Sequence, residues 1–235
     1  MSGFASFFLS TVVVCLFVLG TSAQTTLFNN PTADTLPKGS WGLEGDFIAK
    51  PSPYRDGGYQ TYGYRIAYGV HNRTEVGSNF YYTYDGDRSA AQAEFSIKQN
   101  VYRNEKLGVS VSGGAVVFVP LRSNNSDKTA VMIYGVASKS IEPLNGMTVT
   151  GGAYHIFGGV EDFGDKTGAI VGINQPIVKR VSFVADWFSG KNRIGYASAG
   201  FNFAVTNRQY LTTGYSFGNS GRGNNAFAAY YGITF

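Results

Sequence analysis

The chain has 235 residues, a formal net charge of +4, and a composition in which 15% of the residues are aromatic and only 14% are charged. An average soluble protein is about 25% charged, so this chain has little to present to water. With one cysteine in all, it cannot be a small secreted domain held together by internal disulfides. Lys and Arg are scattered singly, without a stripe or cluster, and nucleic-acid binding is therefore not expected.

The N-terminal segment has the outline of a cleaved signal peptide. Phe4–Leu19 is mostly apolar and is followed by small residues that end at Ala23. This run is shorter than the roughly 20 residues that a membrane-spanning helix needs, and the small residues suit cleavage after Ala23. We expect residues 1–23 to direct export and to be removed together with Cys15, which leaves residues 24–235 as one domain. An uncleaved membrane anchor is the alternative.

After residue 24 the sequence alternates with a period of two, which is typical of β-strands and not of helices. Apolar or aromatic residues occupy every second position of most segments, and small or polar residues lie between them. Two segments, 130–138 and 147–157, alternate poorly, and β-bulges that shift the register would account for this. The segments that alternate clearly are Trp41–Ala49, Tyr62–Val70, Val76–Tyr84, Ala91–Val101, Leu107–Val119, Ala197–Phe203, Leu211–Phe217 and Phe227–Phe235.

The connections between these segments are of two kinds, which alternate along the chain. Tight polar turns lie at 71–74, 103–106, 143–146 and 206–208, whereas connections that are often longer and rich in Gly, Ser and Asp lie at 50–58, 121–128, 158–166 and 218–225. Short turns on one side and longer loops on the other are usual in membrane barrels. The sequence therefore predicts an all-β fold: a single transmembrane antiparallel up-and-down β-barrel of about twelve strands, with both termini on the periplasmic side.

The alternative is a soluble secreted β-domain, which would also alternate. Its water-facing side would normally carry many charged residues, whereas the polar faces of this chain are mostly Gly, Ser, Thr, Ala, Asn and Gln. Small side chains fit the restricted radius of a barrel interior. Tyr and Trp also lie near strand ends, where the headgroup region of a bilayer favours them. Both observations favour a membrane barrel.

The C-terminal strand carries a family resemblance. Tyr231, Ile233 and Phe235 share one face, and the chain ends on an aromatic residue. This resembles the last strand of Gram-negative outer-membrane β-barrel proteins, in which a terminal Phe and alternating apolar positions are read by the barrel-assembly machinery. The hairpin Tyr68–Gly77 also resembles the strand-turn-strand units of small porin-like families. The resemblance implies residence among the lipids of the outer membrane and assembly through Tyr231, Ile233 and Phe235.

Side chains suited to catalysis or metal binding are few. His71 lies in a tight turn, and His155 has no serine at a spacing that resembles a known barrel hydrolase, so no catalytic residue is assigned. The acidic pair Glu161 and Asp162, with Asp165, lacks the spacing of a calcium loop. We therefore expect no enzyme activity, no metal site and no cofactor. A barrel hydrolase that uses His155 is a remote alternative.

A charged minority lies on the small or polar strand faces and is expected to point into the lumen, because Arg or Lys facing lipid at mid-depth would cost about 2 to 4 kcal/mol. These side chains would either line a solute path or pair with one another and fill a narrow interior. The leading hypothesis is a passive porin-like channel for small hydrophilic or mildly amphipathic solutes, and the second is a structural or adhesion-type barrel without transport. The lumen candidates are Glu44, Asp46, Arg65, Glu75, Glu94, Lys98 and Asp186.

Overall fold

The computed structural model describes residues 25–122, 128–159, 163–219 and 225–235, and the predicted signal peptide, residues 1–23, lies outside them. Within these residues, two short 3-10 helices, Tyr54–Asp56 and Glu142–Leu144, lie between strands. No helix among the described residues is long and apolar enough to cross a membrane. The strands are β1 (Trp41–Lys50), β2 (Tyr59–His71), β3 (Thr74–Tyr84), β4 (Ser89–Asn104), β5 (Val109–Arg122), β6 (Ala130–Ile141), β7 (Met147–Gly158), β8 (Thr167–Val178), β9 (Val181–Phe188), β10 (Tyr196–Ala204), β11 (Gln209–Gly218) and β12 (Ala226–Thr234).

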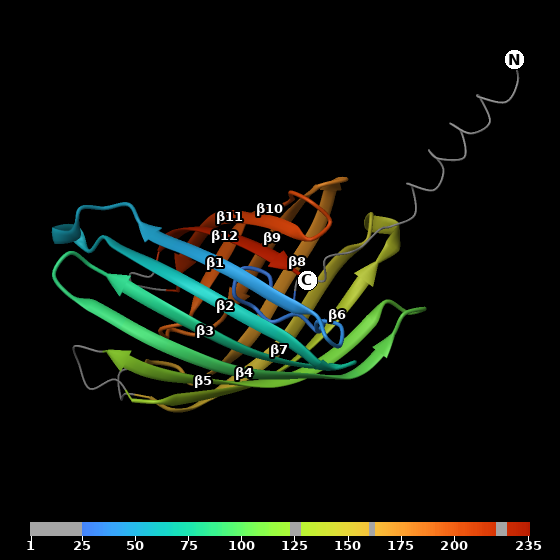
Figure 1. Cartoon of the computed structure of the whole chain (residues 1–235), viewed down its shortest axis with the longest axis horizontal. Coiled ribbons are helices and arrows are strands. Elements are labelled where there is room, and N and C mark those ends of the chain that lie inside the picture. The colour runs from blue at the N-terminus through green and yellow to red at the C-terminus, as the bar shows by residue number, and fades with distance from the viewer. Residues whose placement is uncertain (1–24, 123–127, 160–162, 220–224) are drawn as a thin grey trace, which may run out of the picture.

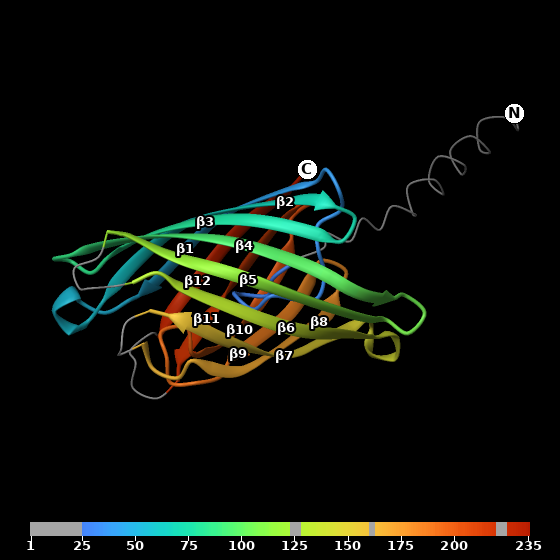
Figure 2. The same cartoon turned by 90° about the horizontal axis from the view of Figure 1, so that it is seen from below.

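These twelve strands close into one barrel in which each strand pairs antiparallel with its sequence neighbours (Figures 1 and 2). The ring is closed by β1 and β12, whose register runs from Gly42 opposite Thr234 to Ala49 opposite Phe227. Closure gives every strand two partners and leaves no edge with unpaired backbone groups. The predicted fold class and strand number are confirmed.

The outer surface of the barrel is apolar and aromatic. Tyr64 and Val101, for example, are 67% and 63% exposed, and exposed large hydrophobic residues occur on strands around the whole ring. Apolar patches on soluble monomers are rarely larger than a few hundred Å². A barrel whose outward positions are apolar on all sides suits hydrocarbon and not water, which argues against the soluble alternative.

The segments that alternate poorly in sequence form the regular strands β6 and β7. Their pairing runs without a register shift from Ala130 opposite Gly158 to Ile141 opposite Met147, so β-bulges are not the reason for the poor alternation. Register shifts occur instead in the β2–β3, β4–β5 and β8–β9 pairs. Alternation is weak in β6 and β7 because apolar side chains such as Met132 and Ile156 also occupy inward positions.

The start of β1 and the end of β12 lie at the end of the barrel that carries the short turns. The N–H of Phe235 donates to the carbonyl of Trp41 at 2.9 Å, which ties the last residue to the start of β1. The connection between β1 and β2, with its 3-10 helix, lies at the opposite end (Figure 1). Residues 123–127, 160–162 and 220–224 of the longer loops lie outside the described residues.

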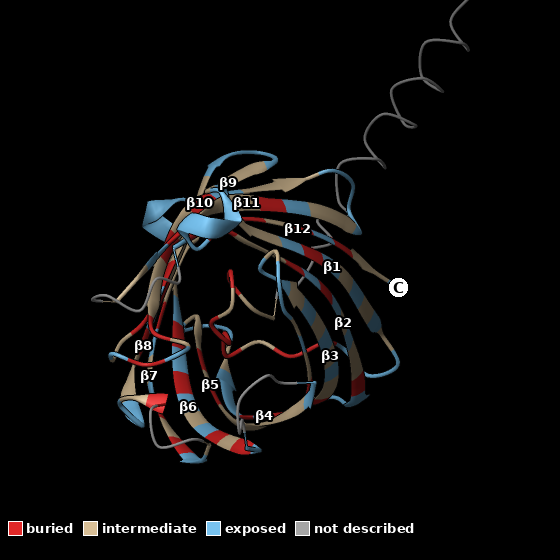
Figure 3. Cartoon of the chain, turned by 90° about the vertical axis from the view of Figure 1, so that its left-hand side faces the viewer, coloured by how far each residue is buried: buried red, intermediate tan, exposed pale blue. Residues whose placement is uncertain are grey.

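The chain that precedes β1 folds into the barrel interior, which the sequence analysis did not anticipate. In Figure 3, which looks along the barrel from the end with the long connections, this segment lies inside the ring of strands. Phe28, Asn30 and Ala33 are each 0% exposed. Residues 25–36 are called the lumen segment below.

Candidate functional site

The barrel interior is the candidate site, because all seven charged residues predicted to face the lumen lie at inward strand positions. Glu44 and Asp46 lie on β1, Arg65 on β2 and Asp186 on β9, while Glu75, Glu94 and Lys98 lie on β3 and β4. Their neighbours along each strand point to the outer, apolar surface. The structure thus brings together five carboxylates and two basic side chains from different parts of the sequence.

Arg65 is the centre of the larger group of charges. Its Nε lies 2.6 Å from Oδ2 of Asp46 and 3.3 Å from Oε1 of Glu44. Glu44 also accepts a hydrogen bond of 2.6 Å from the hydroxyl of Tyr210. The guanidinium carbon lies 5.0 Å from the ring centroid of Tyr230, within the range of a cation–π interaction. Arg65 is therefore fixed by two carboxylates and an aromatic ring.

The second group of charges lies on β3 and β4. Nζ of Lys98 is 3.4 Å from Oε1 of Glu75. Glu94 makes no such ion pair among the described residues and instead accepts hydrogen bonds from the amides of Asn79 and Gln92, at 2.9 and 2.8 Å. Neither of these hydrogen bonds joins Glu94 to the lumen segment, whereas Glu75 and Lys98 each bind it.

The first half of the lumen segment is a compact turn. The N–H of Leu27 donates to the carbonyl of Asn30, and the N–H of Thr32 donates to the carbonyl of Thr25, both at 3.0 Å. The ring of Phe28 at the tip of this turn packs edge-on against Tyr230, with 6.1 Å between centroids. The turn places two successive N–H groups and an aromatic ring against the barrel wall.

Asp186 and Arg65 hold the tip of the turn. Oδ2 of Asp186 accepts hydrogen bonds from the N–H groups of Asn29 and Asn30, at 3.0 and 3.1 Å. Arg65 donates from Nη2 to Oδ1 of Asn29 at 2.5 Å and from Nη1 to the carbonyl of Phe28 at 3.4 Å. Asp186 and Arg65, two of the residues predicted to face the lumen, thus bind the lumen segment, which is part of the same chain.

Ala33 is held from the opposite side of the lumen. Its carbonyl accepts hydrogen bonds from Nδ2 of Asn100 at 2.9 Å and from Oγ of Ser112 at 2.6 Å. Its N–H donates to Oγ of Ser138 at 3.0 Å. Asn100, Ser112 and Ser138 lie on β4, β5 and β6 and are buried. The sequence analysis did not single out these three residues, because it selected lumen candidates by charge and they are neutral.

The two ends of the lumen segment are held by the Lys98–Glu75 pair. Lys98 donates from Nζ to the carbonyl of Thr25 at 2.9 Å, and Oε2 of Glu75 accepts a hydrogen bond from the N–H of Leu36 at 2.9 Å. A cavity of about 110 Å³ remains beside these ends, and Glu44, Arg65, Glu75 and Tyr210 are among the residues that line it.

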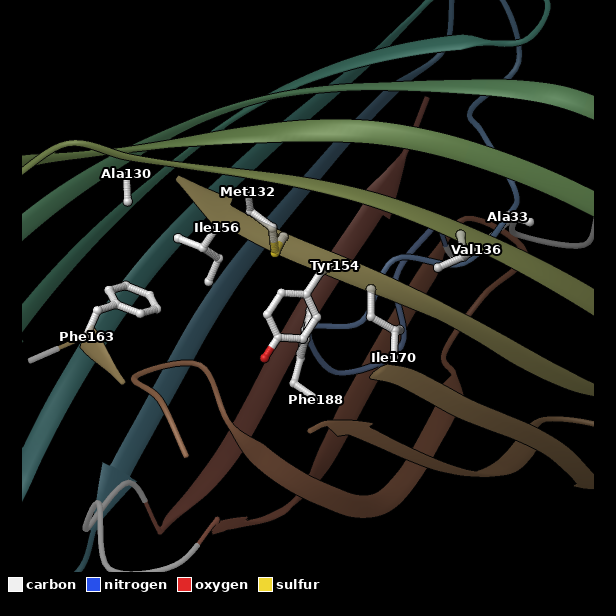
Figure 4. Packing of buried hydrophobic residues seen from close by; sticks show 9 residues of the cluster. All are labelled: Ala33, Ala130, Met132, Val136, Tyr154, Ile156, Phe163, Ile170 and Phe188. Carbon is white, nitrogen blue, oxygen red and sulfur yellow. The ribbon is translucent and has the colours of Figure 1, made fainter. Parts of the chain in front are cut away.

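An apolar cluster occupies another part of the interior (Figure 4). Only Ala33 comes from the lumen segment, while the other members come from β6–β9 and from the connection after β7. Because the wall supplies this cluster almost alone, the cluster does not depend on the lumen segment in the way that the charged groups do. Its buried members are Ala33, Ala130, Met132, Val136, Tyr154, Ile156, Phe163, Ile170 and Phe188.

His155 points to the outside of the barrel, and its Nδ1 lies 2.6 Å from Oγ1 of Thr167 on the next strand. Asp165 accepts a hydrogen bond from the N–H of Lys191, whereas Glu161 and Asp162 lie outside the described residues. Within the described part of the chain, no group of three or more His, Cys, Asp or Glu could hold a metal ion.

Comparison with known proteins identifies the architecture. No protein-family model matches the chain, and no curated protein matches it in sequence. Among solved structures, the KdgM porin is similar with a TM-score of 0.59 at 9% identity, over 83% of this chain and 98% of the porin. The COG4313 outer-membrane channel of Pseudomonas putida F1 gives a TM-score of 0.52 at 15% identity, over 86% of this chain and 98% of the channel. The chain has an outer-membrane β-barrel fold.

An enzyme has the same architecture. The outer-membrane phospholipase A of Escherichia coli gives a TM-score of 0.50 at 10% identity, over 87% of this chain and 95% of the enzyme. At such identities the likeness shows the fold alone. What the barrel does must therefore be argued from its own interior.

Proposed function

We propose that this protein is an outer-membrane channel through which small solutes diffuse passively. The observation that carries the proposal is the inner wall, where Glu44, Asp46, Arg65, Glu75 and Asp186 project into a barrel whose outside is apolar. Charged side chains along a closed interior are the usual lining of a solute path. The likeness to a porin and to an outer-membrane channel supports the proposal.

In this conformation the lumen segment obstructs the interior of the proposed channel. The lumen segment crosses the interior and is bound at β9 through Asp186 and at β4–β6 through its contacts with Ala33. A cavity of about 110 Å³ lies beside it, so the lumen segment narrows the path that a solute would take. We therefore expect conduction to increase when the lumen segment leaves its position.

The test is single-channel conductance in a planar bilayer, with the full mature chain and with a variant that lacks residues 25–36. Heat-dependent mobility on a denaturing gel first establishes that each protein is a folded barrel. We expect discrete currents from the deletion variant and rare openings from the full chain. A folded and inserted deletion variant without current would overturn the channel.

A structural barrel with a permanently filled lumen is the second candidate, favoured by the dense packing around the lumen segment and the apolar cluster. The same deletion experiment separates the two, because a structural barrel would gain no discrete conductance. We also propose that the protein is not an enzyme: replacement of outward-facing His155 by Ala should leave any lipid turnover unchanged, and loss of turnover would contradict this.

Assembly through the C-terminal strand remains part of the proposal. Tyr231 and Phe235 lie on the outer surface at 48% and 58% exposure, with Ile233 between them on the same face of the strand. Deletion of Phe235 should lower the amount of heat-modifiable barrel in the outer membrane, while refolding of the purified chain in detergent proceeds. Equal amounts of membrane barrel with and without Phe235 would remove the assembly role.

A further inference from the structure

The barrel wall holds the lumen segment mainly through its main chain. Side chains of the wall bind four N–H groups, those of Asn29, Asn30, Ala33 and Leu36. They also bind three carbonyl groups, those of Thr25, Phe28 and Ala33. The wall residues that supply these contacts come from β2–β6 and β9: Arg65, Glu75, Lys98, Asn100, Ser110, Ser112, Ser138 and Asp186.

Main-chain groups are common to all peptides, whereas side chains differ. A surface that satisfies N–H and carbonyl groups binds peptides with affinity that depends little on sequence, and pockets for single side chains then add preference. The Leu27 side chain is held in this way: it is buried in an apolar cluster with Val184 and Ala228 of the wall, and it lies so close to Gly172 that a Cβ added there would be 2.4 Å from Cδ1 of Leu27. The lumen wall thus has the two components of a peptide-binding site.

The wall also carries acceptors beyond those that the lumen segment uses. Oδ1 of Asp186, Oδ1 of Asp46 and Oδ1 of Asn100 are buried and have no hydrogen-bond partner among the described residues. Five carboxylates face two basic side chains, Arg65 and Lys98, within this part of the lumen. The surplus of negative charge favours N–H donors and a protonated amino terminus over anionic groups.

We propose that the inner wall of the barrel is a peptide-binding site, that residues 25–36 occupy it as an intramolecular ligand, and that short peptides compete with them for it. This inference rests on the proposed channel and names peptides as its solute class. Asp186 receives two successive N–H groups of the ligand, Glu75 receives one, and Lys98 and Asn100 donate to its carbonyls.

Binding is measured on the folded barrel that lacks residues 25–36, purified in detergent, so that the readout does not depend on conduction. The probe is a fluorescent synthetic peptide with the sequence of residues 25–36. A second peptide carries N-methyl groups at Asn29, Asn30 and Leu36, which removes three N–H donors and keeps every side chain. A control peptide is methylated only at Thr35, whose N–H is in none of the wall contacts above.

We expect the unmodified peptide to bind, the Thr35-methylated control to bind within about threefold of it, and the triply methylated peptide to bind at least tenfold more weakly, as loss of one or more hydrogen bonds of about 1.4 kcal/mol implies. On the wall, Asp186→Ala should weaken binding, whereas His155→Ala, on the outer surface of the barrel, should not. Equal binding of all three peptides would overturn main-chain recognition.

The solute class is tested by competition on the same barrel. Unrelated tripeptides such as trialanine should displace the probe at millimolar concentration, and N-acetylated trialanine, which lacks the protonated amino terminus, should displace it less well. Displacement by the cognate sequence alone would overturn the peptide solute and leave a dedicated plug. Absence of current with peptide binding intact would overturn the channel and not the site, so the two failures are distinguishable.

Discussion

Removal of the Asp186 carboxylate should release the lumen segment without unfolding the barrel. In Asp186→Ala, the N–H groups of Asn29 and Asn30 lose hydrogen bonds of 3.0 and 3.1 Å to a charged acceptor. Such bonds contribute about 1.5 kcal/mol each at the low end of their range, which applies because water can hydrate both groups once the segment leaves. The docked state should therefore lose about 3 kcal/mol, which corresponds to a rise of about 100-fold in the undocked population.

Thiol labelling measures this population. The chain produced as residues 24–235 contains no cysteine, since the single one is Cys15, so Ala33→Cys introduces a unique probe at a position that is fully buried in the docked state. When undocking is a rapid pre-equilibrium, the labelling rate is proportional to the undocked population. We expect a rate about 100-fold higher when Asp186→Ala is added, and a change of less than about threefold when Glu94→Ala is added.

Two outcomes would refute this reasoning. Equal labelling rates in the Asp186→Ala and Glu94→Ala backgrounds would show that the carboxylate does not hold the lumen segment. Fast labelling of Ala33→Cys alone would show that the segment is not docked in the mature protein. Heat-dependent gel mobility of each variant confirms that the comparison is made on folded barrels.

Three further predictions follow from the same geometry. Gly172→Ala places a Cβ 2.4 Å from Cδ1 of Leu27, and the next contact of that Cβ is at 3.8 Å. Overpacking of about 1 to 3 kcal/mol should therefore raise the labelling rate of Ala33→Cys by about tenfold or more. An unchanged rate would show that Leu27 moves aside freely. Arg65→Met leaves the carboxylates of Asp46 and Glu44 without a basic partner and should lower the free energy of unfolding of the barrel by about 3 to 5 kcal/mol. The folded, fast-migrating form on a denaturing gel should then be lost at a lower temperature. An unchanged temperature would mean that water enters this site. The variant without residues 25–36 should pass K⁺ in preference to Cl⁻, because five carboxylates face two basic side chains. Adding Glu94→Gln to this variant should move the reversal potential in a salt gradient toward zero. A preference for anions would contradict the assigned lining.

The sequence contains most of the information for the barrel because lipid outside and a restricted interior inside impose a simple pattern. Where outward residues are apolar and inward ones are polar, as in Tyr62–Val70, period-two alternation predicts both the strand and its faces. β6 and β7 break this pattern because the apolar cluster fills inward positions with Met132 and Ile156. Outward residues are still apolar in these two strands, but many inward residues are apolar too, so the sequence pattern cannot show which face points outward.

The lumen segment could not be predicted in the same way. Its contacts join residues far apart in sequence, such as Asn30 with Asp186, 156 positions away, and no local periodicity reports such pairs. A weaker signal was present: Leu27 and Phe28 are large apolar residues in a stretch before β1 that shows no strand alternation. Apolar residues in such a stretch indicate a segment that is covered by something, although the pattern does not say by what.

The seven charges were expected either to line a path or to pair and fill the interior, and the structure divides these roles among them. Arg65 and Lys98 pair with Asp46, Glu44 and Glu75, and buried ion pairs of this kind are weak evidence for a contribution to stability. Asp186 is different, because it is buried, has no ion pair within 4.0 Å among the described residues, and accepts its hydrogen bonds from the lumen segment. A buried carboxylate without a base is costly unless N–H donors or water reach it. Asp186 therefore suits a site that alternates between a bound peptide and water, and an apolar residue would serve better in a lumen that is filled permanently.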